Sequence, residues 1–368
     1  MGSPKTVANH LTVILKPGRI LSGHFFPAGT RFALCWVLLI QAAGLSASVL
    51  RAQAPQELAY AVVVTGLGGE PAYEKLIEGW GKDLYTVLKS NGLPEDRLFW
   101  LAASRQKGVY AESRREQIGQ LLEKLAARIR PEDVFQLFLI GHGSYDEYDY
   151  RFSIPGPDLT ASQWNELLGR IRAGKQVVIN MTSSSGASLP VLQRKGRVVI
   201  ASTSAGRERN FSVFARYFIE ALQESAADAN KNEEISALEA FRYATHEVSR
   251  YYESYKRLAT EHALLEDRGE GEGSREATPE TRQGLLASSI ALVHLGGSRT
   301  VLDTPEVREL RARKRKLEEA IEEQKYRKAA LDTEEYFQEL ERLLLELSTT
   351  QQRLDGLENA EDPNERKP

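Results

Sequence analysis

The sequence Val-Phe-Gln-Leu-Phe-Leu-Ile-Gly-His-Gly-Ser at residues 134–144 decides the fold. Its first seven residues are almost all apolar, and a run of this length that ends in glycine is typical of a strand buried on both faces of a parallel sheet. Open α/β sheets place their chemistry at the carboxyl ends of such strands. The run therefore predicts a central strand with His142 at its tip.

Residues 176–186, Gln-Val-Val-Ile-Asn-Met-Thr-Ser-Ser-Ser-Gly, repeat this design about forty residues later. Here a hydroxyl cluster stands where the first strand carries histidine. Carboxyl ends of neighbouring parallel strands lie at one edge of a sheet. We therefore expect the two tips to lie side by side.

The rest of residues 59–295 alternates between strand and helix patterns. Strands are predicted at residues 59–65, 97–103, 134–140, 177–180, 197–202 and 286–295, and helices at 73–91, 113–130, 164–173, 211–224 and 240–265. Such alternation implies right-handed crossovers and helices on both faces of the sheet. The predicted fold is a three-layer, doubly wound, mostly parallel α/β sheet.

The chain has 368 residues, enough for one α/β domain and an appendage. Its 48 Lys and Arg residues nearly balance 51 Asp and Glu residues, which leaves a formal charge of -3. Without a basic field, nucleic acid is not an expected partner.

Residues 1–54 have the features of a secretory signal. An apolar stretch at residues 32–50 follows Lys5, Lys16 and Arg19 and precedes the small-residue triplet Ala52-Gln53-Ala54. Cleavage after Ala54 would give an exported protein, periplasmic or extracellular. The alternative is an uncleaved signal anchor, the only case in which the chain would be held in a membrane. The single cysteine, Cys35, lies inside this segment, so the mature chain could form no disulfide.

A strand ending in Gly141-His142-Gly143, then a helix, then a strand ending in a small cluster closed by Ser185-Gly186 resembles the caspase-haemoglobinase group of cysteine peptidases. This group includes the legumains and caspases. The chain is most similar to bacterial legumain-type proteins, through Gly-Gly-Glu-Pro-Ala-Tyr at 68–73 and Arg-Val-Val-Ile-Ala-Ser-Thr-Ser-Ala-Gly at 197–206. The resemblance covers residues 59–295.

The resemblance implies a Cys-x-Ser-Gly site in which cysteine attacks the peptide carbonyl and the strand-end histidine handles protons. On this chain Ser183 takes the place of that cysteine, His142 is the histidine, and the backbone amides of Gly143 and Ser183 would form the oxyanion hole. A serine hydroxyl is much harder to deprotonate than a thiol and usually needs a base that a third group orients. Asp146, Glu147 and Asp149 are the candidates for that group.

The run Arg207-Glu208-Arg209-Asn210 follows the fifth strand, where the family often lines its substrate cleft. Arg207 and Arg209 could bind an acidic side chain there. The alternative is a solvated charged loop.

Residues 228–239 resemble a degenerate EF-hand calcium loop. Oxygen-bearing side chains stand at positions 1, 3, 5, 9 and 12, namely Asp228, Asn230, Asn232, Ser236 and Glu239. Position 6 is Glu233 instead of the glycine that permits the sharp turn. The alternative is a capping box, in which Ser236 and Glu239 begin a helix. No cofactor is required by the rest of the sequence, so calcium is the one candidate.

The segment 303–357 is rich in Glu, Lys, Arg and Leu and predicts helix. Its stronger apolar seam consists of Phe337, Leu340, Leu344, Leu347, Gln351 and Leu354. Two helices joined near Asp332 as an antiparallel hairpin fit better than one rod, and a solvated charged tail is a further alternative. Such a segment must pack on itself, a second copy or a partner. Residues 358–368 are expected to be disordered.

The sequence thus divides into four parts: a signal segment at 1–54, a legumain-like α/β domain at 55–300, a helical hairpin or coiled coil at 303–357 and a tail at 358–368. Three functions are possible for such a chain. The first is an exported legumain-like pseudoenzyme that binds a polypeptide or protein partner through the remnant cleft. The second is an active peptidase or hydrolase that uses a Ser183/His142 dyad. The third is a non-catalytic envelope scaffold that acts through the coiled coil, by self-association or with a partner.

Overall fold

A computed structural model describes residues 57–295 and 304–359. The signal segment expected at residues 1–54 lies outside this range. Of the expected tail at 358–368, the first two residues continue helix α9, so that part of the prediction is wrong. The remainder of the tail lies outside the described residues.

Seven strands form the main sheet, in the order β11-β9-β8-β4-β1-β2-β3. They are β1 (Ala59–Thr65), β2 (Leu98–Ala102), β3 (Ala111–Glu112), β4 (Val134–Gly141), β8 (Lys175–Thr182), β9 (Arg197–Ala201) and β11 (Leu264–Glu266). Every neighbouring pair is parallel except β11 with β9. The five strands β2-β1-β4-β8-β9 have the doubly wound order 2-1-3-4-5. The predicted mostly parallel α/β sheet is confirmed.

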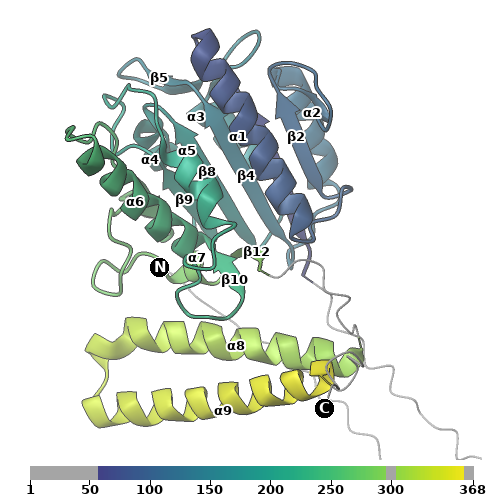
Figure 1. The fold of residues 1–368 in the computed structure, drawn as a ribbon, viewed down its shortest axis with the longest axis vertical. Helices are drawn as coiled ribbons and strands as arrows, with labels where there is room; N and C mark the ends of the chain where they lie inside the picture. Colours follow the sequence, from purple (N-terminus) through teal and green to yellow (C-terminus); the bar gives the residue numbers. More distant parts are fainter. Residues whose placement is uncertain (1–56, 296–303, 360–368) are drawn as a thin grey trace, which may run out of the picture. The chain divides into compact units, whose positions relative to one another are not determined.

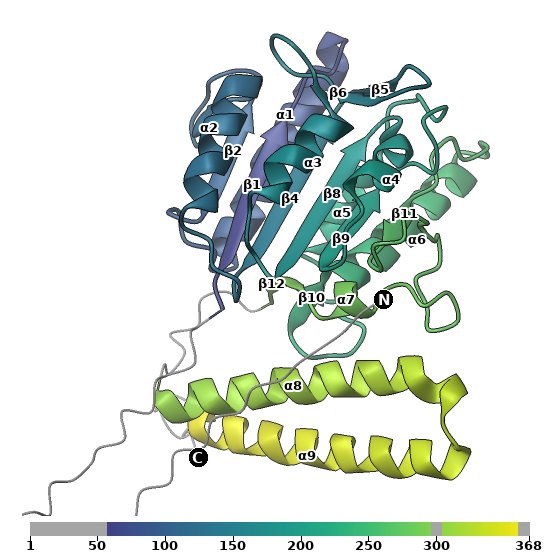
Figure 2. The same ribbon diagram turned by 180° about the vertical axis from the view of Figure 1, so that it is seen from behind.

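Helices cover both faces of this sheet (Figures 1 and 2). On one face lie α1 (Pro71–Ser90), α5 (Phe214–Ala221) and α6 (Ala237–Ser254). On the other face lie α2 (Arg115–Ala126), α3 (Ala161–Gly169) and α4 (Leu189–Leu192). The sheet and its two helical layers form the three layers that the alternating pattern predicts.

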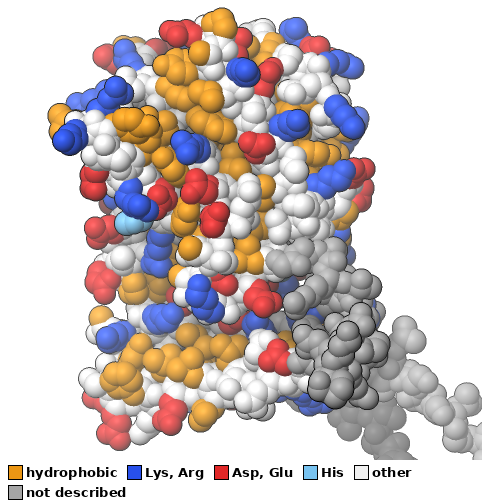
Figure 3. All heavy atoms as spheres, in the orientation of Figure 1, with side chains coloured by type: hydrophobic (Ala, Val, Ile, Leu, Met, Phe, Trp, Pro, Cys, Tyr) orange, Lys and Arg blue, Asp and Glu red, His pale blue; other side chains and the backbone are white. Residues whose placement is uncertain are grey.

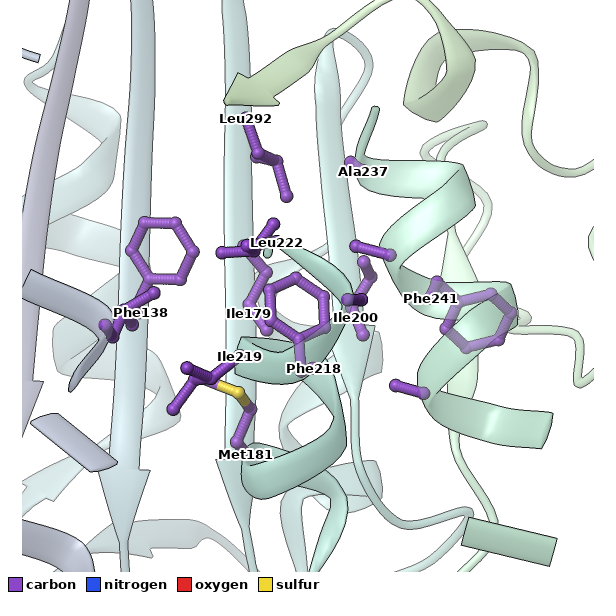
Figure 4. Packing of buried hydrophobic residues seen from close by; sticks show 14 of the residues in the cluster. Phe138, Ile179, Met181, Ile200, Phe218, Ile219, Leu222, Ala237, Phe241 and Leu292 are labelled. Atoms are coloured by element: carbon purple, nitrogen blue, oxygen red, sulfur yellow. The ribbon is translucent and has the colours of Figure 1, made fainter. Parts of the chain in front are cut away.

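Strand β4 shows why the apolar run 134–140 forms a central strand. All eight of its residues are buried. Phe138 and Ile140 pack on the α1, α5 and α6 face, whereas Leu137 and Leu139 pack on the opposite face. Figure 4 shows Phe138 beside Ile179 and the residues that α5 contributes to this layer.

Two expectations about the end of the domain are wrong. The helix expected at 240–265 ends at Ser254, and its last residues enter β11, which pairs antiparallel with β9. The strand expected at 286–295 forms α7 (Leu285–Ser288) and β12 (Ala291–His294). β12 pairs with β10 (Glu234–Ser236) outside the main sheet. A small sheet of β5 (Gly143–Tyr145), β6 (Tyr150–Phe152) and β7 (Leu159–Thr160) was not predicted.

The carboxyl-terminal segment is an antiparallel helical hairpin of α8 (Pro305–Arg327) and α9 (Thr333–Asn359), joined by the short helix η2 (Lys328–Ala330) (Figure 1). Leu310 near the start of α8 packs on Leu354 near the end of α9. Leu317 and Ile321 pack on Leu343. The hairpin prediction is therefore confirmed, including the break beside Asp332.

The seam of α9 differs from the predicted one at alternate positions. Leu340, Leu347 and Leu354 belong to it as predicted. Tyr336, Leu343 and Thr350 complete the buried stripe, whereas Phe337 and Leu344 are 57% and 48% exposed. These two side chains and Leu345 leave an apolar surface on α9, and Figure 3 shows hydrophobic side chains gathered over the hairpin.

Helix α8 also contacts the α/β domain. Tyr326 Oη donates a hydrogen bond of 2.7 Å to the carbonyl of Gln283, and Lys175 forms a 2.8 Å ion pair with Glu319. Lys314 Nζ lies 3.4 Å from the carbonyl oxygen of Asn232. Within residues 57–295 and 304–359, no helix is long and apolar enough to cross a membrane.

Candidate functional site

The two strand tips lie side by side, as predicted. Gly141 at the end of β4 is in register with Thr182 at the end of β8. His142 follows Gly141 and Ser183 follows Thr182, so these two residues are neighbours across the strand ends. His142 Nδ1 lies 2.9 Å from Ser183 Oγ. The pair is positioned by the ladder of a fully buried sheet, so no flexible loop is needed to bring it together.

Ser183 Oγ is held by three contacts. Besides His142, it donates a 2.9 Å hydrogen bond to the carbonyl of Gly143 and accepts one of 3.1 Å from the Gly143 backbone N–H. A hydroxyl has one hydrogen and two acceptor positions, so these contacts use its full capacity in the tautomer in which Nδ1 of His142 carries the proton and donates it. The side chain is also buried, since Ser183 is 1% exposed.

One of these contacts engages the Gly143 backbone N–H, which was predicted to stabilise the oxyanion. The N–H of Gly143 points at the oxygen of Ser183, so it is not free to receive a substrate oxyanion in this arrangement. Only glycine fits at position 143, because a Cβ there would lie 2.3 Å from the Ser183 carbonyl oxygen and 2.6 Å from the Tyr150 ring.

His142 is half-buried and uncharged at neutral pH. Burial lowers the pKa of His142, and the negative charge of Asp158 opposes this only in part. In the described part of the chain no carboxylate hydrogen bonds to the His142 ring; its one bond is to Ser183. The group that orients a catalytic histidine is therefore not in place.

None of the three predicted candidates for that group hydrogen bonds to the His142 ring, and Asp146 is engaged elsewhere. Asp146 forms a 2.8 Å ion pair with Arg151 and accepts the backbone N–H groups of Tyr148 and Asp149. The hydrogen bond from Arg151, together with those backbone N–H groups, lowers the pKa of Asp146 to about 2. Asp146, Glu147 and Asp149 thus shape the β5–β6 turn, and their assignment to His142 is wrong. Asp158, which precedes β7, was not identified from the sequence.

A buried polar layer supports the tips, and sequence reasoning missed it. Tyr150 Oη lies 2.6 Å from Thr182 Oγ1 and donates to Asn180 at 3.2 Å. Asn180 in turn donates to Ser188 at 3.0 Å. Burial raises the pKa of Tyr150, so its hydroxyl stays protonated as a donor. The signal available in the sequence was Asn180, a polar residue inside an otherwise apolar strand.

Ser184 is the most constrained residue of the hydroxyl cluster. Its φ of 58° lies in the left-handed region, which is costly for a residue with a Cβ. Its backbone N–H donates to the carbonyl of Glu208 at 2.8 Å. Its hydroxyl is fully buried and has no partner among the described residues. Such strain and an unsatisfied polar atom together are typical of functional sites.

The predicted cleft residues Arg207 and Arg209 lie beside the second tip, on a loop that we call the cleft loop (residues 204–210). Both side chains are exposed, and Arg209 Nη2 donates to the carbonyl of Tyr145 at 3.4 Å. Gly206 allows Tyr145 to cover this loop, because a Cβ at Gly206 would lie 2.2 Å from the Tyr145 ring. The cleft loop is thus joined to the second tip through the Ser184–Glu208 backbone hydrogen bond, and the binding of an acidic side chain by Arg207 and Arg209 stays an untested prediction.

Glu208 fastens the cleft loop, which the sequence did not indicate. Its carboxylate accepts hydrogen bonds from the N–H and the hydroxyl of Ser204, both at 2.8 Å, and from His262 Nδ1 at 2.7 Å. Burial raises the pKa of Glu208, but the bonds from His262 and Ser204 outweigh this and hold the pKa below its usual value. Glu208 therefore stays charged at neutral pH.

The calcium-like loop has its oxygens engaged by the protein itself. Asp228 accepts backbone N–H groups of Asn232 and Glu233, and Asn230 accepts that of Asn232. Ser236 and Glu239 form the alternative capping box at the start of α6, which is confirmed. Among residues 57–295 and 304–359 no cluster of three or more His, Cys, Asp or Glu is arranged to hold a metal. Calcium binding here stays an untested prediction.

No family model matches the chain, and no curated protein is similar enough to match it.

Proposed function

We propose that this protein is an exported homologue of legumain-type peptidases that has lost hydrolytic activity and binds a polypeptide or protein partner through the cleft around His142 and Ser183. The observation that carries the proposal is the state of Ser183 Oγ. The oxygen is buried, fully hydrogen bonded, and bonded to the very amide that should stabilise the oxyanion.

Hydrolysis would require several contacts to change at once. Attack needs the serine oxygen about 3–3.5 Å from a substrate carbonyl. Ser183 must then leave Gly143, and His142 must take its proton without a carboxylate that fixes the ring. A binding role needs none of these changes, and the exposed side chains of Arg207 and Arg209 are available to a partner.

The alternative of an active Ser183/His142 hydrolase draws on two observations. The two side chains are within hydrogen-bond distance, and burial keeps His142 in the neutral form that a general base requires. The scaffold alternative draws on the hairpin, whose exposed Phe337, Leu344 and Leu345 would let two copies pair as a coiled coil.

Peptide hydrolysis by wild type and two variants separates the hypotheses, and a third variant provides a thiol at the same position. Cys35 is the only cysteine of the full chain, so Ser183→Cys in the mature chain of residues 55–368 carries a single thiol. We expect no hydrolysis of a fluorogenic peptide library by wild type, His142→Ala or Ser183→Ala. Hydrolysis by wild type that disappears in both variants would establish the active hydrolase and end the pseudoenzyme proposal.

The same thiol tests the geometry of the site. A thiol beside His142 gains thiolate character. We expect alkylation of Ser183→Cys by iodoacetamide at pH 6.5 to slow about tenfold when His142→Ala is added. Equal rates in the two proteins would show that the tips do not form a coupled pair in solution.

Binding is tested with peptides selected from a phage-displayed library on the mature chain. We expect Arg209→Ala to weaken a selected peptide about tenfold. The control is Arg170→Ala, which removes the exposed arginine that follows α3 and pairs with Glu166. Equal affinity in both variants, or no selected peptide, would contradict a role of this cleft in binding.

A further inference from the structure

A surface pocket of about 270 Å³ lies between α6 and the segment that follows β11. Its lining consists of Arg242, Thr245, His246 and Ser249 from one side and Arg275, Glu276, Ala277 and Thr278 from the other. The first four residues are spaced i, i+3, i+4 and i+7, so they form one face of α6. The pocket shares no residue with the His142–Ser183 pair.

The pocket concentrates positive charge. Arg242 Nη2 donates a 2.5 Å hydrogen bond to the carbonyl of Ala277, which fixes its guanidinium across the gap between the two walls. Arg275 forms no ion pair and no hydrogen bond with any other residue of the described ranges. The lining thus contains two exposed arginines and one acidic residue, Glu276.

The neighbouring acid on α6 does not neutralise this charge. Glu247 forms a 3.0 Å ion pair with Arg250, which lies outside the lining, and its carboxylate lies 4.0 Å from Nε2 of His246, which lies in the lining; neither Arg242 nor Arg275 pairs with it. Guanidinium groups recognise the oxygens of phosphate and carboxylate through paired, charge-assisted hydrogen bonds. An arginine without an acidic partner, held in a concave site, is therefore set up to receive an anion.

A buried hydroxyl supplies an independent observation. Thr245 Oγ1 is buried and has no hydrogen-bond partner in the described part of the chain. A buried hydroxyl without a partner costs free energy, and native proteins rarely keep one. The atom has almost no exposed surface, so a ligand oxygen in the pocket would satisfy it after the Thr245 side chain turns to another rotamer.

We propose that this pocket binds a phosphoryl-type oxyanion, with Arg242 and Arg275 as charged donors and the Thr245 hydroxyl as a neutral donor. The size of the pocket suits a single phosphoryl group with a few attached atoms. The group can be free phosphate or the phosphorylated side chain of a protein, because both present the same oxygens. This site is independent of the function proposed for the strand tips.

The first experiment is a calorimetric titration of the mature chain with inorganic phosphate, with the amide signals of residues 242–249 and 275–278 followed by NMR. Two charge-assisted contacts predict a Kd of about 1 mM. We expect Arg275→Ala to weaken binding at least tenfold. Arg170→Ala, which removes the same charge just after α3, should leave it within twofold. An absence of saturable binding, or an equal loss in both variants, would overturn the proposal.

Thr245→Val sharpens the test because it removes an unsatisfied atom. We expect about threefold weaker phosphate binding without a lower melting temperature. Unchanged binding would remove Thr245 from the proposed donor set, and the site as proposed would fail. A phosphoserine peptide compared with its serine counterpart then identifies the source. Tighter binding of the phosphopeptide than of phosphate indicates a protein ligand, and the reverse indicates the free anion; both outcomes support the site.

Discussion

The central strands of the α/β domain and the α9 helix of the hairpin are both rich in apolar residues, yet burial constrains them differently. In β4 every residue is buried, and alternate side chains pack on opposite helical layers. In α9 only one stripe is buried, and large side chains such as Leu344 stay exposed. A strand enclosed on both faces has one way to pack, whereas a two-helix hairpin can rotate a helix and still bury leucines. Which residues of α9 are buried is therefore less strongly determined than which residues of β4 are buried, and mutations in α9 test the packing more sensitively.

Leu343 and Leu344 are adjacent and chemically identical, so they test the seam directly. Leu343 is 5% exposed and packs on Leu317 and Ile321, whereas Leu344 is 48% exposed. We expect Leu343→Ala to destabilise the hairpin by about 2 kcal/mol, the low end for a buried leucine in a small core. Leu344→Ala should change it by less than about 0.5 kcal/mol.

Hydrogen exchange of the α8 and α9 amides measures this difference, because it reports local opening free energy apart from the α/β domain. The reverse ranking would restore the seam predicted from the sequence. Equal large losses would indicate that Leu344 is also buried, as in a coiled coil formed by two copies.

The contrast also shows what the sequence could reveal. The long apolar runs before His142 and before the hydroxyl cluster locate both tips, because burial on two faces leaves a strong local pattern. Asp158 and Tyr150 reach the same site from the segment that follows β4. Their positions depend on the β5–β6–β7 sheet, whose strands of two or three residues are too short to give a periodic signal.

The edge strand β11 was not predicted for the same reason, because it is too short to give a periodic signal. β11 has three residues, Leu264–Glu266, and follows a helix pattern without a clear break. Its pairing with β9 is decided by the exposed edge of the sheet. The prediction of the α9 seam was correct at half of its positions. The reason is that a three-four alternation starting at Phe337 and one starting at Tyr336 share Leu340, Leu347 and Leu354.

The contact between hairpin and domain should depend on pH through Glu318 on α8. Burial raises the pKa of Glu318 to about 7, with Glu234 of β10 adding to the shift and Lys314, Asn232 and Arg315 opposing it. This pKa is above the unfolded value of 4.5. The contribution of Glu318 to the free energy of unfolding is therefore fully present below about pH 4.5 and is lost as the pH rises through 7.

We expect wild type to lose on the order of 2 kcal/mol of stability relative to Glu318→Gln between pH 4.5 and 8, since each pKa unit corresponds to about 1.4 kcal/mol and solvent screens part of it. Chemical denaturation at a series of pH values measures both proteins. Glu323→Gln, an exposed position of α8, is the control and should follow wild type. Parallel profiles for wild type and Glu318→Gln would show that Glu318 is not buried against the domain.

The smallest expected effect is the most informative about the strand tips. Ser184 combines a φ of 58° with a buried hydroxyl that lacks a partner, so Ser184→Gly should raise the free energy of unfolding by about 1 kcal/mol. Ser185 is the control, because its hydroxyl lies 3.2 Å and 3.1 Å from those of Ser202 and Thr203, and Ser185→Gly should destabilise. A residue kept at a cost to stability beside Ser183 implies a ligand contact. If Ser184→Gly is more stable than wild type and binds the peptides selected for the cleft more weakly, the strain at Ser184 serves binding. If the variant is less stable, the Ser184 side chain supports the left-handed turn, and the argument for a ligand contact fails.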